Sequence, residues 1–218
     1  MLFLLQKRHE NLKSLDADKF FIIVNVKNRI EKHPLDPFLP KNAKLLMLGS
    51  FPPPQKRWCM QFYYPNFNND MWRILGLVFF KDKNYFVRVS DKIFDKEKIV
   101  RFLNEAGIAI YDTVREVRRL KDNASDAFLE VVTPTDVPKM LKGLYTCSAV
   151  VTTGTLATET LCAVLGAEPP KVGGHSPFLL GNRKMLLYRM PSSSRAYPLA
   201  LVAKAKTYLS MFKDLEMV

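Results

Sequence analysis

Four short apolar runs, each ending at a residue that stops or turns a strand, limit what this chain of 218 residues can fold into. They lie at 45–48, 108–111, 149–152 and 185–189. Unbroken apolar runs of this length are typical of strands that are buried on both faces of a parallel sheet. The sequence therefore predicts an α/β protein, a three-layer α/β/α sandwich with a central, mainly parallel four-stranded sheet.

Helical patterns fill most of the segments between these runs. We expect helices over 69–80, 95–106, 136–145 and 155–165, and a last helix that runs towards Phe212. Two further segments are predicted without strands. Residues 114–132 are basic and then helical, and residues 167–183, which are rich in proline and glycine, form a loop.

The composition indicates one globular domain with an N-terminal arm. With 48% hydrophobic and 25% charged residues, the chain can bury a proper core. Apolar residues recur at roughly helical spacing over 1–33, although 20–24 would serve equally as a strand, and three prolines end this segment. We expect a helical arm over 1–33 and one domain over 34–218.

Charge and cysteine usage restrict the class of protein. Lys and Arg number 33 against 21 Asp and Glu, a net charge of +12, which favours a polyanionic partner such as nucleic acid; a merely basic protein is the plain alternative. Three cysteines without CxxC spacing argue against disulfides, a zinc site and a cysteine-held iron–sulfur cluster, so we expect no metal and no cofactor. The apolar run at 1–5 is too short for a secretory signal or a membrane span, which predicts a cytoplasmic protein.

The stretch after the first apolar run holds most of the polar and aromatic side chains that could do chemistry. Gly49 ends the run and lets the backbone turn sharply. Prolines at 52–54 keep the next residues extended, so the loop is stiff as well as exposed. Open α/β sheets bind ligands at such a place, beyond the carboxyl end of a central strand.

Three patterns in this stretch resemble the uracil-DNA glycosylase superfamily, most closely its hypoxanthine-DNA glycosylase and mismatch-specific branch. They are Gly-Ser-Phe-Pro-Pro at 49–53, Phe-Tyr-Tyr at 62–64 and Asn-Asp-Met-Trp at 69–72. The relatives read roughly G-S-M-P-G, a Tyr-Tyr pair and N-x-F-W, with the same spacing between the first tyrosine and the asparagine. The resemblance covers about residues 34–212.

This resemblance implies a monomeric, monofunctional DNA glycosylase associated with the nucleoid. Such an enzyme binds double-stranded DNA that carries a damaged or mismatched base and flips out a deaminated base, hypoxanthine or uracil. It then hydrolyses the N-glycosidic bond without a cofactor. Two alternatives remain open: a DNA-binding protein of the same fold without activity, and a hydrolase of free nucleosides or nucleotides.

Asn69 and Asp70 are the catalytic candidates. The resemblance implies that Asn69 orients water or contacts the base through its amide, and a helix N-cap is an equally good interpretation of an asparagine at this place. Asp70 is a candidate general base. Its alternative, a carboxylate that interacts with the positive end of the helix dipole, is the stronger one.

A flipped base would be held by residues from the strand ends and the aromatic loop, namely Gly49, Ser50, Phe51, Tyr64 and Thr153. Tyrosine rings offer flat faces for stacking, and alternation indicates that either Tyr63 or Tyr64 faces the pocket while the other packs in the core. In the relatives, an asparagine that reads the base edge often stands in place of Thr153.

A second motif follows the last apolar run and resembles the Pro-Ser loop of the superfamily. It consists of Pro191, Ser192, Ser193, Ser194 and Arg195. By resemblance, the hydroxyls and the free amides of a helix N-terminus grip DNA phosphates, and Arg195 adds charge or fills the vacated stack. A loop that only caps the last helix is the alternative. Lys56 and Arg57 are expected at the same edge.

Two positions differ from the uracil-specific relatives in residues that matter for catalysis. Phe51 stands in place of a water-activating aspartate, and Met190 stands in place of a histidine before the proline.

Asp112 matches an aspartate often seen after the second strand, with a turn or cap role as the alternative. His175 is treated as an incidental loop residue, and His33 as part of the arm.

Overall fold

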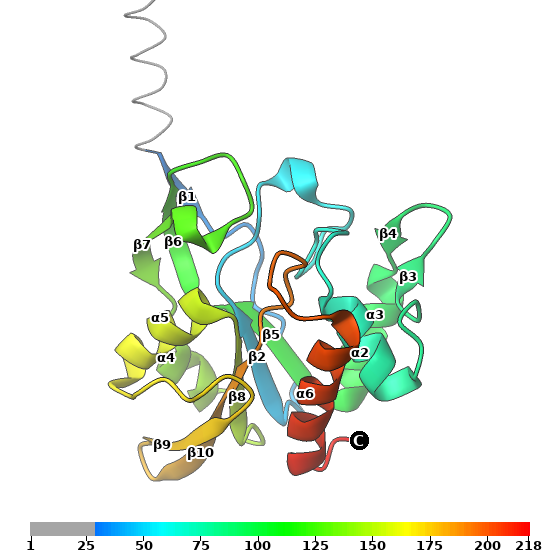
Figure 1. Ribbon diagram of the computed structural model, residues 1–218. Helices are drawn as coiled ribbons and strands as arrows, with labels where there is room; N and C mark the ends of the chain where they lie inside the picture. The colour runs from blue at the N-terminus through cyan, green and yellow to red at the C-terminus, as the bar shows by residue number, and fades with distance from the viewer. Residues whose placement is uncertain (1–28) are drawn as a thin grey trace, which may run out of the picture.

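A five-stranded sheet lies at the centre of the computed structural model, which describes residues 29–218 (Figure 1). The strand order is β5-β2-β8-β10-β9. The strands are β2 (Leu45–Gly49), β5 (Ile108–Asp112), β8 (Ala149–Thr153), β9 (His175–Leu180) and β10 (Arg183–Met190). The first four in this order pair in parallel, and β9 pairs antiparallel with β10. The predicted parallel sheet is confirmed, with β9 as an additional edge strand.

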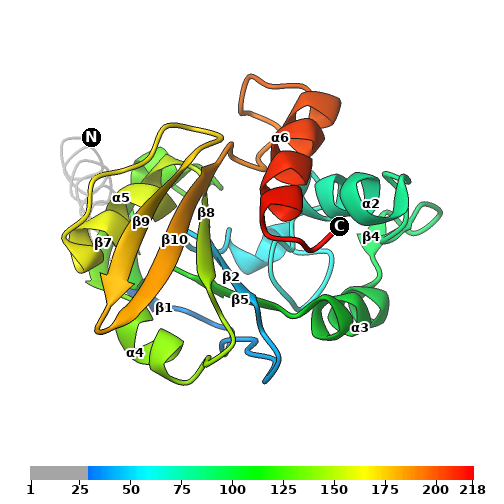
Figure 2. The same ribbon diagram turned by 90° about the horizontal axis from the view of Figure 1, so that it is seen from below.

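Helices cover both faces of this sheet (Figure 2). One face carries α2 (Met71–Phe80), α3 (Lys96–Ala106) and α6 (Leu201–Asp214), and the other carries α4 (Val137–Lys142) and α5 (Thr155–Leu165). The expected cap of α3 is present, since the Asp95 side chain accepts a hydrogen bond from the Lys98 N–H. Gly107 ends α3 in the left-handed conformation, with φ +69°. The three-layer arrangement is therefore the predicted one.

A second sheet stands where 114–132 was predicted to be helical, and that prediction is wrong. The sheet is antiparallel, with the order β1-β6-β7, and contains β1 (Ile30–Lys32), β6 (Val114–Arg119) and β7 (Leu129–Pro134). Val114 and Val117 are both fully buried although they are three residues apart, the spacing of a helix face. A bulge in β6 between them turns both side chains inward, so the strand imitates helical periodicity.

The predicted N-terminal helical arm falls mostly on residues 1–28, which lie outside the described residues. The last part of the predicted arm contains β1, at residues 30–32, which pairs with β6 instead of forming a helix. His33 follows β1 directly, and its backbone N–H donates to the Arg115 carbonyl at 2.8 Å. The polypeptide therefore enters the domain along the second sheet.

The segment 167–183 is also more regular than predicted, because β9 lies within it. β9 pairs with β10 around a turn at Gly181, where φ is +58°. Pro177 had favoured a loop, but β9 is an edge strand, which tolerates a residue without an N–H. The remaining elements are the hairpin β3 (Val87–Arg88) and β4 (Ile93–Phe94) and the 3-10 turns η1 (Gln55–Arg57) and η2 (Asp126–Phe128).

The carboxyl ends of the parallel strands meet at one edge of the central sheet. In the strand register Gly49 lies beside Asp112, and Met190 lies beside Thr153. All residues of β2, β5 and β8 are buried, which makes this edge a closely packed platform. The loops that follow β2 and β10 lie beside each other above the sheet (Figure 1), and an isolated bridge joins Asn69 to Ser194.

Over residues 29–218, no helix has the length and apolar character needed to cross a membrane.

Candidate functional site

A cavity of about 640 Å³, called the pocket below, opens at the carboxyl edge of the sheet. Its wall comes from the loop after β2, the end of β5, the segment around η2, the turn between β8 and α5, and the loop after β10. Most of the predicted site residues line it: Gly49, Ser50, Phe51, Tyr64, Asn69, Thr153, Ser192, Ser193 and Ser194. Asp70, Pro191 and Arg195 lie outside its lining.

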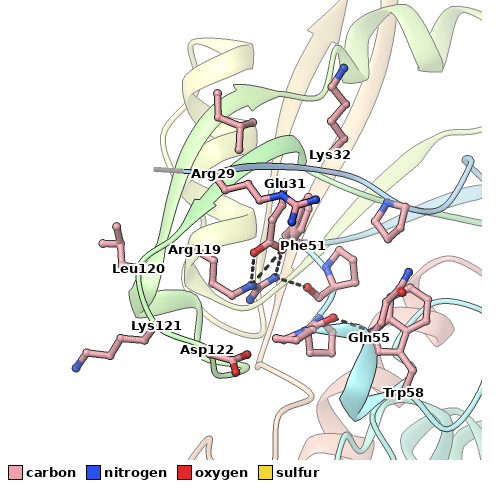
Figure 3. A pocket seen from close by; sticks show the side chains of 15 residues that line it. Arg29, Glu31, Lys32, Phe51, Gln55, Trp58, Arg119, Leu120, Lys121 and Asp122 are labelled. Atoms are coloured by element: carbon pink, nitrogen blue, oxygen red, sulfur yellow. Dashed lines mark hydrogen bonds and ion pairs between the residues drawn. The ribbon is translucent and has the colours of Figure 1, made fainter. Parts of the chain in front are cut away.

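A second cavity, of about 720 Å³, is also lined by the prolines at 52–54 and shares Phe51 with the pocket (Figure 3). Arg119 points into it and is already engaged. Its guanidinium donates to both carboxylate oxygens of Glu31, at 3.0 to 3.2 Å, and to the Pro52 carbonyl at 3.0 Å. The Arg119 guanidinium in this second cavity is neutralised by Glu31. In the pocket, by contrast, polar side chains from several elements converge, so we take the pocket as the candidate site.

Tyr64 forms part of the pocket wall and has an unusual backbone. Its φ is +49°, a left-handed conformation that a tyrosine adopts at a cost in strain. Its hydroxyl lies 3.1 Å from the Thr153 Oγ1. Burial, and next the nearby Asp112 charge, raise the pKa of Tyr64, so its hydroxyl stays protonated. The Tyr63 hydroxyl points elsewhere and donates to the Asp36 carbonyl at 2.7 Å.

Asn69 directly precedes Asp70, which is the N-cap residue of α2, so the predicted N-cap position of Asn69 is wrong by one residue. The Asn69 Oδ1 accepts a hydrogen bond from the Met71 N–H at 2.9 Å, at the start of α2. Its Nδ2 has no hydrogen-bond partner among residues 29–218, and the side chain is half-buried in the pocket lining. The oxygen therefore stabilises the helix start while the amide N–H groups remain for a ligand.

Asp70 is held by cations at the junction of α2 and α6. Its Oδ1 accepts from the Arg195 Nε at 3.1 Å, and its Oδ2 accepts from the Lys204 Nζ at 3.2 Å. Lys204 is 1% exposed and also donates to the Ser194 carbonyl at 2.7 Å. The backbone N–H of Asp70 donates to the Ser193 carbonyl at 2.9 Å. This geometry indicates that Asp70 joins the loop that carries Asn69 to the loop at 191–195, called the serine loop below. It favours that structural role over one as a general base.

The serine loop does not cap the last helix, because α6 begins only at Leu201, after Ala200 at its N-cap. Instead its side chains organise the loop itself. The Ser192 Oγ accepts from the Ser194 N–H, and the Ser194 Oγ accepts from the Ala196 N–H, both at 3.2 Å. The expected anion site at a helix N-terminus is therefore absent from this loop, although its serines still line the pocket.

Asp112 and His33 form a pair at the pocket floor. The His33 Nε2 lies 2.8 Å from the Asp112 Oδ2, within hydrogen-bond distance, and the imidazole and Tyr111 ring centroids are 4.7 Å apart. A Cβ at Gly49 would lie 2.4 Å from the Asp112 Oδ1, so the carboxylate sits over the glycine. His33 was assigned to the arm, and only the long-range pairing of β1 with β6 brings it here.

Asp126 is a pocket residue that the sequence interpretation missed. The Ser50 Oγ donates to the Asp126 Oδ1 at 2.8 Å. Burial raises the pKa of Asp126, the Asp112 charge raises it further, and the Ser50 hydrogen bond and Arg119 act in the opposite direction. Its segment was predicted to be helical, and only a preference of aspartate for loops beside a site could have drawn attention to it.

Phe51 and the nearby cations complete the pocket surroundings. Phe51 is 8% exposed and packs on Val114 and Val117, so it contributes mainly to the core. Arg57 lines the pocket, while the predicted Lys56 pairs with Asp122 at the surface. Within residues 29–218 no group of three His, Cys, Asp or Glu side chains could hold a metal ion.

Comparison with solved structures places this fold among known ones. No protein-family model matches the sequence, and the comparison with curated proteins finds no significant match. The chain is similar to the solution NMR structure of a "putative Uracil DNA glycosylase" from Methanosarcina acetivorans, with a TM-score of 0.55 and 20% sequence identity. The likeness covers 86% of this chain and 99% of that one, and at this identity it establishes a shared α/β fold.

Proposed function

We propose that this protein is a DNA glycosylase that flips one nucleotide out of double-stranded DNA and hydrolyses the bond between its base and sugar. The observation that carries the proposal is the convergence of polar side chains from separate segments on one pocket at the carboxyl edge of a parallel sheet. The fold likeness to the Methanosarcina protein, whose description reads "putative Uracil DNA glycosylase", supports the same activity. The net charge of +12 fits a polyanionic partner.

The base side of the pocket suits hypoxanthine or uracil, the deaminated bases that the sequence patterns indicate. Tyr64 and Thr153 present hydroxyls on one wall, and Asn69 presents its free amide N–H groups on another. These groups can donate hydrogen bonds to carbonyl oxygens of a flipped base. In this proposal Asn69 also orients the attacking water, while Asp70 stays outside the chemistry.

The DNA side is the serine loop with the cations around it. Ser192, Ser193 and Ser194 line the pocket, and their hydroxyls can donate hydrogen bonds to a phosphate. Arg195 extends from the same loop, and nearly half of its side chain is exposed although its Nε is paired with Asp70. Phosphate contacts of this kind position a duplex without reading its sequence.

The pocket favours simple hydrolysis over a covalent mechanism. None of the described residues that line it is a lysine, which a Schiff-base mechanism would require. Lys204 is buried in the Asp70 ion pair outside the pocket. We therefore propose a monofunctional enzyme. As the resemblance implies, we also propose that it acts as a monomer and needs no cofactor.

The test is an excision assay on matched duplexes that contain uracil, hypoxanthine, xanthine, a G·T mismatch or no lesion. Strand cleavage after alkali at one or more lesions, with none in the undamaged duplex, is the expected result. Salt-dependent duplex binding without excision would instead identify a non-catalytic DNA-binding protein. Hydrolysis of free deoxyinosine or deoxyuridine without duplex binding would identify a nucleoside hydrolase.

A further inference from the structure

Two carboxyl groups face the pocket and have no part in the roles given so far. Asp112 ends β5, and Asp126 begins η2, so they reach the pocket from different elements. Each has one oxygen engaged by a neighbour and one that has no hydrogen-bond partner among residues 29–218. Their surroundings differ in a way that separates the behaviour of an acid from that of a base.

Asp112 is arranged as a proton acceptor. The His33 Nε2 lies 2.8 Å from its Oδ2, so this oxygen is engaged and only Oδ1 is left to meet a water. Its Oδ1 lies over Gly49, where any side chain would collide with it. The glycine therefore leaves Oδ1 free at the pocket floor, near the Tyr64 hydroxyl.

Asp126 is arranged as a proton donor. The Ser50 hydroxyl occupies its Oδ1, so a proton on this group resides on Oδ2. Burial is the largest influence on the pKa of the Asp126 carboxyl group, and it raises that pKa. Of the neighbouring groups, Asp112 also raises it, while Ser50 and Arg119 lower it. A carboxyl group whose pKa is raised by burial is typical of a general acid, and a second carboxyl group in the same pocket can serve as the base.

We propose that Asp126 gives a proton to the departing base and that Asp112 takes a proton from the attacking water. The proposal rests on the proposed glycosylase function and assigns catalytic residues to it. The neutral Asp126 hydroxyl also donates to a carbonyl oxygen of the base but faces an exocyclic amino group unfavourably. The same group therefore selects bases that carry an oxygen where adenine or cytosine carries an amino group.

The bond between C1′ and the base nitrogen breaks, its electron pair stays on the base, and the Asp126 Oδ2 proton moves to an acceptor atom of that base. The water oxygen bonds to C1′, and one water proton moves to the Asp112 Oδ1. Passage of that proton from Asp112 to Asp126 through solvent restores both groups, so one water is consumed per base released.

The test compares Asp126→Asn and Asp112→Asn with the wild-type protein in single-turnover excision across pH. Each variant is nearly isosteric and should excise at least about a hundredfold more slowly, the scale of general acid–base catalysis, with duplex binding unchanged. The wild-type rate should fall at high pH as Asp126 loses its proton, since burial raises the pKa of this carboxyl group. Asp126→Asn should remove that fall, and Asp112→Asn should keep it.

A second measurement separates acid catalysis from a structural role and also works if a variant fails to fold. A base that leaves readily as an anion needs no proton, so 5-fluorouracil in place of uracil, or 2-fluorohypoxanthine in place of hypoxanthine, should rescue Asp126→Asn but not Asp112→Asn. With the wild-type protein, the same substrates should abolish the fall in rate at high pH. If Asp126→Asn slowed excision of the fluorinated and the unfluorinated base equally, the inference would be overturned. The same holds if the fluorinated base left the wild-type pH profile unchanged. In both cases excision itself would still support a glycosylase. Absence of excision at every lesion would overturn both.

Discussion

The junction of α2 and α6 and the floor of the pocket each bury an aspartate to the same extent, yet the two sites differ in charge. Asp70 and Asp112 are both 6% exposed. Asp70 has two cationic partners, Arg195 and Lys204, whereas Asp112 has one imidazole and faces a second carboxyl group. A buried carboxyl group with two cationic partners is typical of a structural ion pair. A buried carboxyl group with fewer cationic partners, beside a cavity, is typical of a reactive site. Burial alone does not distinguish these roles, whereas the identity of the partners does.

The largest expected effect is on the structural side of this comparison. Lys204→Met removes a buried cation and leaves Asp70 with only the half-exposed Arg195, so we expect a loss of about 3–5 kcal/mol in the free energy of unfolding. Denaturant unfolding measures it. The double variant Asp70→Asn with Lys204→Met removes both charges and should recover most of the loss. A loss below about 1 kcal/mol in the single variant would show that the ion pair does not hold the two loops together.

The next largest effect concerns the amide that lies between the two regions. Asn69→Ala should slow single-turnover excision by about a hundredfold, the scale for loss of one well-placed polar catalytic group. It should also cost about 1 kcal/mol of stability, because the Met71 N–H loses its acceptor.

Asn69→Asp is the matched control for this effect, because aspartate accepts the Met71 hydrogen bond as well as asparagine but offers no amide N–H to a ligand. We expect normal stability and slow excision. Full stability together with full excision on all tested bases would show that the asparagine serves the helix alone.

The strands of the parallel sheet were predictable, whereas two strands outside it were not. The runs that became β2, β5 and β8 are buried throughout, so their composition alone identified them. β6 was missed because its bulge gives Val114 and Val117 helical spacing, and β9 was missed because it contains Pro177. Both lie outside the parallel core, where the environment of a strand depends on its neighbours more than on its own residues.

The site was predictable on the side that is continuous in sequence. The loop from Gly49 to Asn69 lies within one stretch, and its order of glycine, aromatic and amide residues is visible as a pattern. Asp126 and His33 carry no such pattern, because Asp126 meets Ser50 across 76 residues and His33 meets Asp112 across 79. Chain topology creates these contacts, and a single sequence does not show it.

On the pocket side of the comparison, removing a carboxyl group should stabilise the protein. Folding raises the pKa of Asp126, so ionised Asp126 weakens the folded state, and this penalty is absent at low pH, where the group is protonated in both states. Asp126→Asn should therefore match the wild-type stability at low pH and exceed it as pH rises past the ordinary aspartate range. Unfolding free energies measured across pH test this. Lower stability of the variant at neutral pH would mean that the carboxylate is stabilised where it lies.

The smallest effect is expected at Arg195, which touches both regions because it holds Asp70 and lies beside the serine loop. Its side chain is nearly half exposed, so Arg195→Ala should cost less than about 1 kcal/mol of stability. If it also contacts a phosphate, the slope of log Kd against log salt concentration should fall by roughly one unit. Arg57→Ala, at the pocket lining, should lower the slope by a similar amount without touching Asp70. Arg101→Ala, on the exposed surface of α3, should leave it unchanged. A slope that Arg195→Ala does not alter would confine this arginine to the structural side of the molecule, with Arg57 as the next candidate for the contact with DNA.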